Sequence, residues 1–305
     1  MTTQDIEFEK RGHSYGVIHL RAPQDGTLMD LVAFFIDHFQ VNARADELLQ
    51  LGAVYLENQR QTDPSLGVRQ GQYLRLHTQP RRFQKPLENM KDCILHQEDD
   101  FYVVNKPAGI STHASVDNLH ENLHAWLEKD LAESLYLTSR LDVPTHGLLI
   151  YARTKDFQSY FNRCLNEKSV RKEYRAAHEG APLAAGVYEH WMQISPRAPK
   201  TLWATKPSHE PSQQCLLEIL RSEQSKDQNH CISQILLLTG RTHQIRAQLS
   251  QLGRPILGDT LYHGKKKSCW DTNRISLFCH RLQFQNYDFQ LPEKELRCLD
   301  RDQEQ

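Results

Sequence analysis

An arginine and an aspartate stand two residues apart in the stretch TSRLDVPTHGLLIYART, residues 138–154. Pro144 and Gly147 follow Asp142, and an apolar run comes directly after them. This order predicts that Asp142 lies on a turn at the rim of a sheet, just before a buried strand. A carboxylate in that position can act on a ligand, but it is also a common residue of solvated turns. The stretch alone leaves both interpretations open.

A second stretch, TGRTHQIRAQLSQLGRPILGDTLY at residues 239–262, places polar side chains where a helix should begin. Apolar residues recur at helical spacing from Ile245, and Gly253 is expected to end the helix. The donors in its first turns are Arg241, Thr242, His243, Gln244 and Arg246. Donors at a helix N-terminus suit an anion such as phosphate or a carboxylate. The alternative is a solvent-facing helix surface, which would need fewer donors than five in six positions.

Together these two stretches resemble the two signature segments of the RluA family of RNA pseudouridine synthases. VVNKPAGIST at 103–112 and RKEYRA at 171–176 are similar to further segments of that family, in the same order. The resemblance extends from residue 94 to about residue 290. It implies an isomerase that detaches uracil from its ribose, turns it, and rejoins it through carbon. Such a reaction needs no redox step and no group donor.

The resemblance also implies roles for individual residues. Asp142 matches the catalytic aspartate, and Arg246 matches the arginine that pairs with it. Tyr174 matches the tyrosine that stacks on the uracil, and its alternative is a strand tyrosine buried for packing. Arg140 matches the arginine that fills the space of a flipped-out nucleotide, and its alternative is a structural ion pair.

Other cations are candidates for contacts with RNA phosphates, each with a solvated surface charge as the alternative. These are Lys106, Arg241, His243 and the run Lys265-Lys266-Lys267.

The chain departs from the family pattern at three places. Ser139 stands where the family usually has His, and His146 stands where it usually has Ser. Leu277-Phe278-Cys279 replaces a Leu-His-Ala segment. None of these changes removes Asp142, so we expect them to affect substrate preference rather than the class of reaction.

A lone carboxylate suits such an isomerisation, because hydrolysis of a glycosidic bond usually employs two carboxylates. In a pocket without water, Asp142 needs a cation to stay charged, and a guanidinium suits this task. The sequence has no dinucleotide fingerprint, phosphate-binding Gly-rich loop or cluster of metal ligands. We therefore expect neither a metal nor a cofactor.

The order of elements predicts an α+β fold with a mixed, largely antiparallel sheet. We expect a module at 1–80, a linker at 81–92, a catalytic domain at 93–292 and a polar tail at 293–305. Two helices and a short hairpin at 28–79 resemble the small RNA-binding domain named after ribosomal protein S-four. Residues 69–85 hold five cations and no acid, which favours either RNA contact or a solvated linker.

Composition sets limits on the class of protein. The 305 residues carry a formal net charge of −1, and the seven cysteines form no Cys-x-x-Cys pair. No basic leader and no run of eighteen apolar residues occurs, which predicts a cytoplasmic protein without a membrane partner. We expect a monomer whose partner is ribosomal or transfer RNA.

Two alternatives stay open at this point. The chain could be a non-catalytic RNA-binding or ribosome-assembly protein that retains the fold, although such a protein should have lost Asp142, Tyr174 or Arg246. A glycosidase acting on a small nucleoside would need a second well-placed acid.

Overall fold

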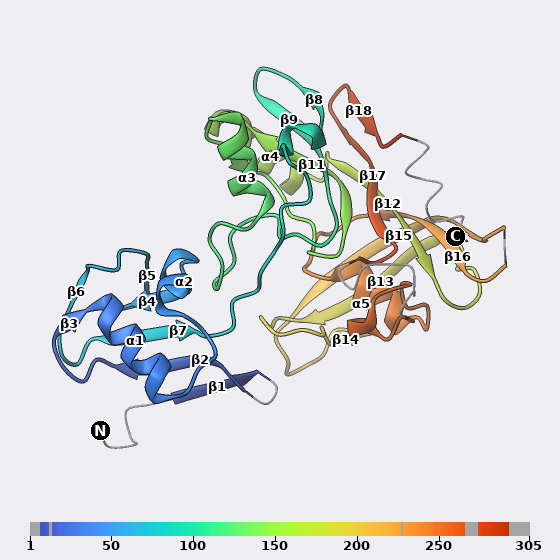
Figure 1. The fold of residues 1–305 in the computed structure, drawn as a ribbon. Helices are drawn as coiled ribbons and strands as arrows, with labels where there is room; N and C mark the ends of the chain where they lie inside the picture. Colours follow the sequence, from blue (N-terminus) through green and yellow to red (C-terminus); the bar gives the residue numbers. More distant parts are fainter. Residues whose placement is uncertain (1–6, 12–13, 227, 266–273, 293–305) are drawn as a thin grey trace. The chain divides into compact units, whose positions relative to one another are not determined.

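The computed structural model describes residues 7–11, 14–226, 228–265 and 274–292, which form two compact units (Figure 1). The first unit contains Met1–Pro86 and His113–Lys129, and the second contains Leu87–Thr112 and Asp130–Gln305. The sequence placed 113–129 in the catalytic domain, whereas the structure groups this segment with the N-terminal unit. The expected polar tail at 293–305 lies outside the described residues. Within the described ranges, no helix is long and apolar enough to cross a membrane.

The first unit is a five-stranded antiparallel sheet with two helices. Its strands follow the spatial order β1-β2-β7-β4-β5, and β3 pairs with β6 separately. The elements are β1 (Glu7–Arg11), β2 (Ser14–Arg21), β3 (Gly26–Thr27), α1 (Leu28–His38), α2 (Ala45–Gln50), β4 (Val54–Leu56), β5 (Gln59–Gln61), β6 (Gly67–Val68) and β7 (Tyr73–His77). Both helices, the β4–β5 hairpin and β7 were predicted from the sequence, and β1 and β2 were not.

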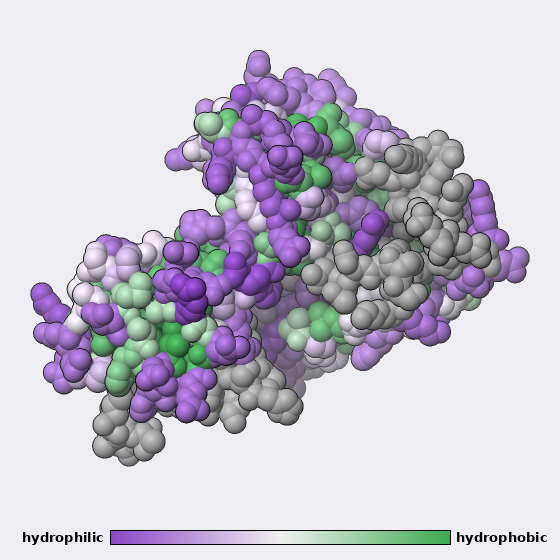
Figure 2. Space-filling model, viewed as in Figure 1, coloured by the Kyte–Doolittle hydropathy of each residue, from purple (hydrophilic) through white to green (hydrophobic). Residues whose placement is uncertain are grey.

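An amphipathic helix and the middle of the sheet form the core of this unit. Thr27 caps α1 by accepting a hydrogen bond from the Asp30 amide at 3.2 Å. Val32 and Phe35 are fully buried on the inner face of α1, against Ile18 of β2. Figure 2 shows a mainly hydrophilic surface on this unit with an apolar area over α1. Phe34 of α1 is 48% exposed.

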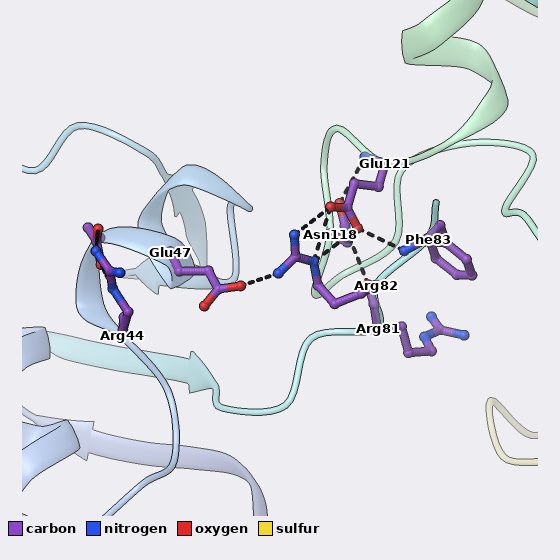
Figure 3. A network of polar contacts seen from close by, with 8 residues as sticks. Arg44, Glu47, Arg81, Arg82, Phe83, Asn118 and Glu121 are labelled. Carbon is purple, nitrogen blue, oxygen red and sulfur yellow. Dashed lines mark hydrogen bonds and ion pairs between the residues drawn. The ribbon is translucent and has the colours of Figure 1, made fainter. Parts of the chain in front are cut away.

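The segment 113–122 is attached to this unit by charged hydrogen bonds (Figure 3). Arg82 binds the Glu121 carboxylate with its Nε and Nη2 at 3.0 and 2.7 Å, and it also pairs with Glu47 of α2. Arg81 donates to Asp117, whose side chain is fully buried. Asn118 donates to the Arg81 carbonyl at 2.7 Å. Two cations of the basic linker therefore hold a loop in place through acidic partners.

Replacing Arg82 with Glu should loosen this segment, because the new carboxylate would be repelled by those of Glu47 and Glu121. The pairs are half exposed, so the loss of global stability should be no more than about 1 kcal/mol. We expect faster amide hydrogen exchange across residues 115–122, measured by mass spectrometry. Arg69→Glu, an equal charge change at an exposed position of the same basic segment, should leave exchange there unchanged. Equal exchange in both variants would contradict this role of Arg82.

The second unit is built on one large mixed sheet. Its strands follow the order β14-β13-β15-β16-β12-β17-β11-β9-β8, with β10 beside β11 and β18 beside β17. The strands are β8 (Ile94–Gln97), β9 (Phe101–Lys106), β10 (Tyr136–Leu137), β11 (His146–Ala152), β12 (Arg171–His178), β13 (Gly186–Gln193), β14 (Leu202–Trp203), β15 (Ser212–Gln224), β16 (Cys231–Leu237), β17 (Leu277–Phe284) and β18 (Tyr287–Gln290). The helices are α4 (Lys155–Asn166) and α5 (Gln244–Gln251), and two short 3-10 helices are η2 (Met90–Cys93) and η3 (Thr260–Tyr262). Helix α3 (Leu123–Leu131) belongs to the first unit up to Lys129.

All pairs in this sheet are antiparallel except β11 with β17. The predicted fold class, α+β with a mixed and largely antiparallel sheet, is therefore confirmed. Strand β11 is buried along its whole length, as the apolar run in the sequence indicated. Helix α5 packs on one end of the sheet, where Ala247 contacts Met192 of β13 and Cys215 of β15 in a small cluster.

Gly147 makes the parallel pairing possible. It has φ of +114°, and a Cβ at this position would lie 2.3 Å from the carbonyl oxygen of Cys279. The sequence predicted that the strand begins at Gly147, directly after the turn, and the structure places this glycine near the start of β11, opposite Cys279 of β17. Only glycine allows the two backbones to approach so closely next to the turn that carries Asp142.

Gly147→Ala is expected to destabilise the protein by about 3 kcal/mol, because backbone strain and a steric clash act together. Chemical denaturation of the purified variant measures this loss. Gly186→Ala is a matched control in the same sheet, since Gly186 has φ of +141° with no atom within 4 Å of an added Cβ. It should cost only about 1 kcal/mol. Equal losses of stability in the two variants would show that the close approach of β17 adds nothing to the cost of Gly147→Ala.

Candidate active site

Asp142 lies on a tight turn between β10 and β11, and several hydrogen bonds hold this turn. The Thr145 amide donates to the Asp142 carbonyl at 3.1 Å, and the Gly109 amide donates to the Val143 carbonyl at 2.8 Å. The Thr112 hydroxyl donates to the Leu141 carbonyl at 2.7 Å. The Asp142 side chain is 23% exposed. The carboxylate is therefore fixed at the rim of the sheet yet open to a ligand.

Lys106 lies beneath this turn with its side chain 0% exposed. Its ammonium donates to the carbonyls of Pro107 and Thr145 at 2.9 Å, and to those of Asp142 and Val143 at 3.3 Å. Burial lowers the pKa of Lys106 to about 7, against the opposing effect of the Asp142 charge. An RNA phosphate contact was predicted for this residue. The structure gives it carbonyl partners instead, so it positions the turn.

The low pKa of Lys106 predicts how stability changes with pH. In the unfolded chain a lysine titrates near pH 10.4, so between pH 7 and 10 the unfolded state binds more protons than the folded state. Stability should therefore rise with pH across this window, by about 2 kcal/mol between pH 7 and 9. Below pH 7 both states are charged and the burial cost is fully present. Lys106→Met should lack this pH-dependent gain in urea unfolding; an identical gain in both proteins would refute the assignment.

Arg246 connects Asp142 to a second carboxylate. It donates from Nε and Nη2 to Asp259 at 2.6 and 2.8 Å, and from Nη1 to Asp142 Oδ2 at 3.2 Å. Arg246 is 4% exposed and Asp259 only 1%. Burial would lower the pKa of Arg246, but its bonds with Asp259 and Asp142 raise it above the usual value. A permanently charged guanidinium thus faces Asp142 in a largely water-free position.

Helix α5 fixes this arginine because its polar residues point inward. Gln244 donates to the Leu216 carbonyl at 3.0 Å, and Gln248 donates to the carbonyls of Tyr188 and Cys215 at 3.3 and 3.4 Å. The sequence predicted an anion site from five donors at this helix start. The structure turns Gln244 and Arg246 into the protein and leaves Arg241 and Thr242 exposed.

His243 and Tyr262 complete the side of the site next to Arg246. His243 Nε2 lies 4.0 Å from Asp142 Oδ2, and its Nδ1 lies 3.1 Å from the Tyr262 hydroxyl. The Tyr262 ring also lies under the Arg246 guanidinium, whose Cζ is 5.1 Å from the ring centre. Burial is the main reason why the pKa of His243 is lowered and that of Tyr262 is raised.

Tyr174 is placed by β12, which pairs with β17 on one side and β16 on the other. It is 5% exposed. Burial, followed by the Cys279 thiol and the Asp142 carboxylate, raises its pKa well above the usual value. The phenol therefore stays neutral and lies within electrostatic reach of Asp142.

Those of the remaining predicted residues that the structure describes lie at the protein surface. Arg140 is exposed on the turn that carries Asp142. Arg241 is exposed before α5, where its Nε donates to the Gln214 carbonyl at 3.5 Å. Lys265 pairs with Glu179 at 3.5 Å. Lys266 and Lys267 lie outside the described residues.

Two departures from the family pattern meet in the structure. His146 and Phe278 are paired across β11 and β17, and their rings stack with centroids 4.7 Å apart. Burial lowers the pKa of His146 to about 3, with Arg274 and Lys106 adding to the effect. This histidine is therefore neutral and part of the core.

Sequence reasoning gave no role to Asp259 or Tyr262. Both belong to the quoted GDTLY segment, but nothing in their spacing shows that they lie against Arg246. A signal was present, since a buried arginine that offers one nitrogen to Asp142 needs another acceptor for the others. Among the described residues, no group of three or more His, Cys, Asp or Glu side chains could hold a metal ion.

Comparisons with known proteins identify relatives of this chain. Residues 100–251, which include Asp142, Tyr174 and Arg246, match the RNA pseudouridylate synthase family. The chain is 33% identical over 214 residues to RNA pseudouridine synthase 6, chloroplastic, of Arabidopsis thaliana, covering 63% of this chain and 45% of that protein. It therefore spans about half the length of this relative. Ribosomal large subunit pseudouridine synthase D of Vibrio parahaemolyticus is 29% identical over 234 residues, covering 74% and 69% of the two chains.

Solved structures agree at the level of the fold. The structure of human RNA pseudouridylate synthase domain containing 1 superposes with a TM-score of 0.55 at 24% identity, covering 68% of this chain and 85% of that one. The structure of human RNA pseudouridylate synthase domain containing 4 superposes with a TM-score of 0.53 at 23% identity, covering 69% of this chain and 92% of that one. The large mixed sheet is thus the fold of pseudouridine synthases. Through residues 100–251, this chain belongs to the RNA pseudouridylate synthase family.

Proposed function

We propose that this protein is an RNA pseudouridine synthase that isomerises specific uridines in structured RNA and uses Asp142 as its catalytic carboxylate. The observation that carries this proposal is the buried Asp259–Arg246 pair, which presents one guanidinium nitrogen to the partly exposed Asp142. It supplies what an isomerisation without an external acceptor needs, one charged and oriented carboxylate.

The surrounding residues fit the same reaction. Lys106 and Thr112 hold the turn, so the carboxylate does not have to be reoriented for each cycle. In this proposal the ring of Tyr174 stacks on the uracil, and its neutral phenol acts near the reacting carbon. In the same proposal Arg140, exposed on the turn that carries Asp142, enters the space of the flipped-out nucleotide and so lowers the net cost of flipping.

The RNA substrate is proposed to be large-subunit ribosomal RNA or transfer RNA. The name of the Vibrio relative refers to the large ribosomal subunit. The N-terminal unit, whose helices and hairpin resemble the domain named after ribosomal protein S-four, would help to hold the RNA. We propose that the protein acts as a monomer in the cytoplasm.

Incubation of the purified protein with transcribed large-subunit RNA fragments and with transfer RNAs tests this function. Pseudouridine is then mapped at nucleotide resolution. New sites that appear with the wild-type protein and not with Asp142→Asn support the proposal. RNA binding without conversion in any of these RNAs would favour a non-catalytic RNA-binding protein that retains the fold.

A further inference from the structure

The hydroxyl of Tyr262 has one proton and two polar neighbours. The Lys200 amide donates to its oxygen at 2.9 Å, and Nδ1 of His243 lies 3.1 Å away. Tyr262 is only 3% exposed. In the part of the chain that the structure describes, Nδ1 of His243 is the acceptor within reach of this hydroxyl. The hydroxyl proton is therefore directed to Nδ1.

This hydrogen bond fixes the tautomer of His243. A neutral imidazole has one acceptor nitrogen and one N–H, so a ring that accepts at Nδ1 carries its proton on Nε2. Burial lowers the pKa of His243, although the Asp142 charge next to it acts in the opposite direction. Among the other charges around the ring, Arg246 and Lys200 lower the pKa and Asp259 raises it. His243 is thus neutral near pH 7.

The Nε2–H group faces the catalytic carboxylate without bonding to it. Nε2 lies 4.0 Å from Asp142 Oδ2, which is too far for a direct hydrogen bond. That same oxygen already accepts from Arg246. The His243 side chain is 18% exposed, so a ligand can reach it. The donor is therefore available to whatever binds against Asp142.

The backbone also indicates a placed residue. His243 has φ of +61° directly before α5, a conformation that costs energy for a side chain with a Cβ. Such strain is frequent where a side chain must reach a defined position. Here it directs the imidazole between Tyr262 and Asp142.

We propose that His243 donates a hydrogen bond from Nε2 to an oxygen of the uridine bound against Asp142, and that Tyr262 is a positioning residue that fixes the required tautomer. The proposal deepens the proposed function and rests on it. His243 would hold the nucleoside against the carboxylate, a more specific role than contact with an RNA phosphate.

The first test needs no substrate. In the full-length protein labelled with 15N-histidine, NMR should show His243 protonated at Nε2 and unprotonated at Nδ1 near pH 7. Tyr262→Phe keeps the ring under Arg246 and removes only the hydroxyl, so it should shift the tautomer equilibrium toward Nδ1–H. Tyr188→Phe is the control, because that hydroxyl bonds the Ala184 carbonyl outside the site. A wild-type His243 protonated at Nδ1 would overturn the proposal.

The second test compares two amides in single-turnover assays on a converted RNA. The Gln side-chain amide reaches the position of Nε2 and can donate there, whereas the shorter Asn amide reaches only the position of Nδ1. His243→Asn should lower the rate about 100-fold with little change in RNA affinity. His243→Gln should recover a large part of the rate, and Tyr262→Phe should lose about tenfold. Wild-type rates in His243→Asn, or equal losses in Asn and Gln variants of equal stability, would overturn the proposal.

The two tests separate this proposal from the function on which it rests. If the wild-type protein converts no RNA, the proposed function fails while the NMR result still reports the tautomer. If the wild type converts RNA but the His243 variants match it, only the role of His243 is refuted.

Discussion

Asp142→Asn is expected to lower the rate of pseudouridine formation by at least about 10⁴-fold while the protein stays folded and still binds RNA. The amide is uncharged, so it cannot supply the ionised group that the reaction requires. Folding should be preserved because Arg246 keeps its two hydrogen bonds to Asp259 when the Asp142 charge is removed. Single-turnover conversion and a filter-binding assay on the same RNA measure the two quantities.

Asp288→Asn provides the matched control for this change. Asp288 pairs with Arg281 on β17 and its side chain is 40% exposed, so its loss should leave turnover unchanged. A residual rate within tenfold of wild type in Asp142→Asn would contradict the assigned role. Loss of RNA binding together with turnover would indicate that Asp142 serves folding instead.

Arg246→Lys should lower turnover by about 10² to 10³-fold. An ammonium cannot bond Asp259 with two parallel hydrogen bonds and reach Asp142 at the same time. Arg246→Met should have a second effect, because Asp259 would be left buried without a partner. Removing one member of such a pair typically costs about 3–5 kcal/mol. Thermal or urea unfolding separates this loss from the catalytic one.

Arg254→Lys is the control for the arginine exchange. Arg254 follows the same helix and donates to the Ala181 and Gly253 carbonyls, away from Asp142. Its replacement should leave turnover near the wild-type level. An Arg246→Lys enzyme with wild-type turnover would show that a point charge near Asp142 is sufficient and that the paired geometry is not required.

Much of the fold could be predicted because apolar spacing reports which face of an element is buried. Leu148 and Ile150 of β11 lie in the core, as the apolar run indicated, and α5 ends before Gly253, which has φ of +69°. Strands β1 and β2 were not predicted, and β2 supplies Ile18 and Leu20 to the core of the first unit. β2 pairs with β7, more than fifty residues further along the chain, and β1 pairs with β2. Local patterns do not encode the distant pairing of β2 with β7.

The candidate site could be predicted only in part, because the spacing of charged residues does not show which of them are buried. Lys106 was expected at a phosphate, yet four carbonyls surround its ammonium. Arg82 was counted in a basic strip, yet it pairs with Glu47 and Glu121. Both depend on acceptors brought together by the folded chain. The sequence shows which residues are charged, but it does not show which residues they pair with in the folded chain.

The most direct test of the central claim is nucleotide-resolution mapping of pseudouridine in total RNA from cells that lack this protein. The cells are rescued with a wild-type copy or with Asp142→Asn expressed at the same level. We expect specific sites to disappear on deletion, to return with the wild-type copy and to stay absent with Asp142→Asn. Sites that return with Asp142→Asn, or a map that does not change on deletion, would contradict a synthase that acts through this carboxylate.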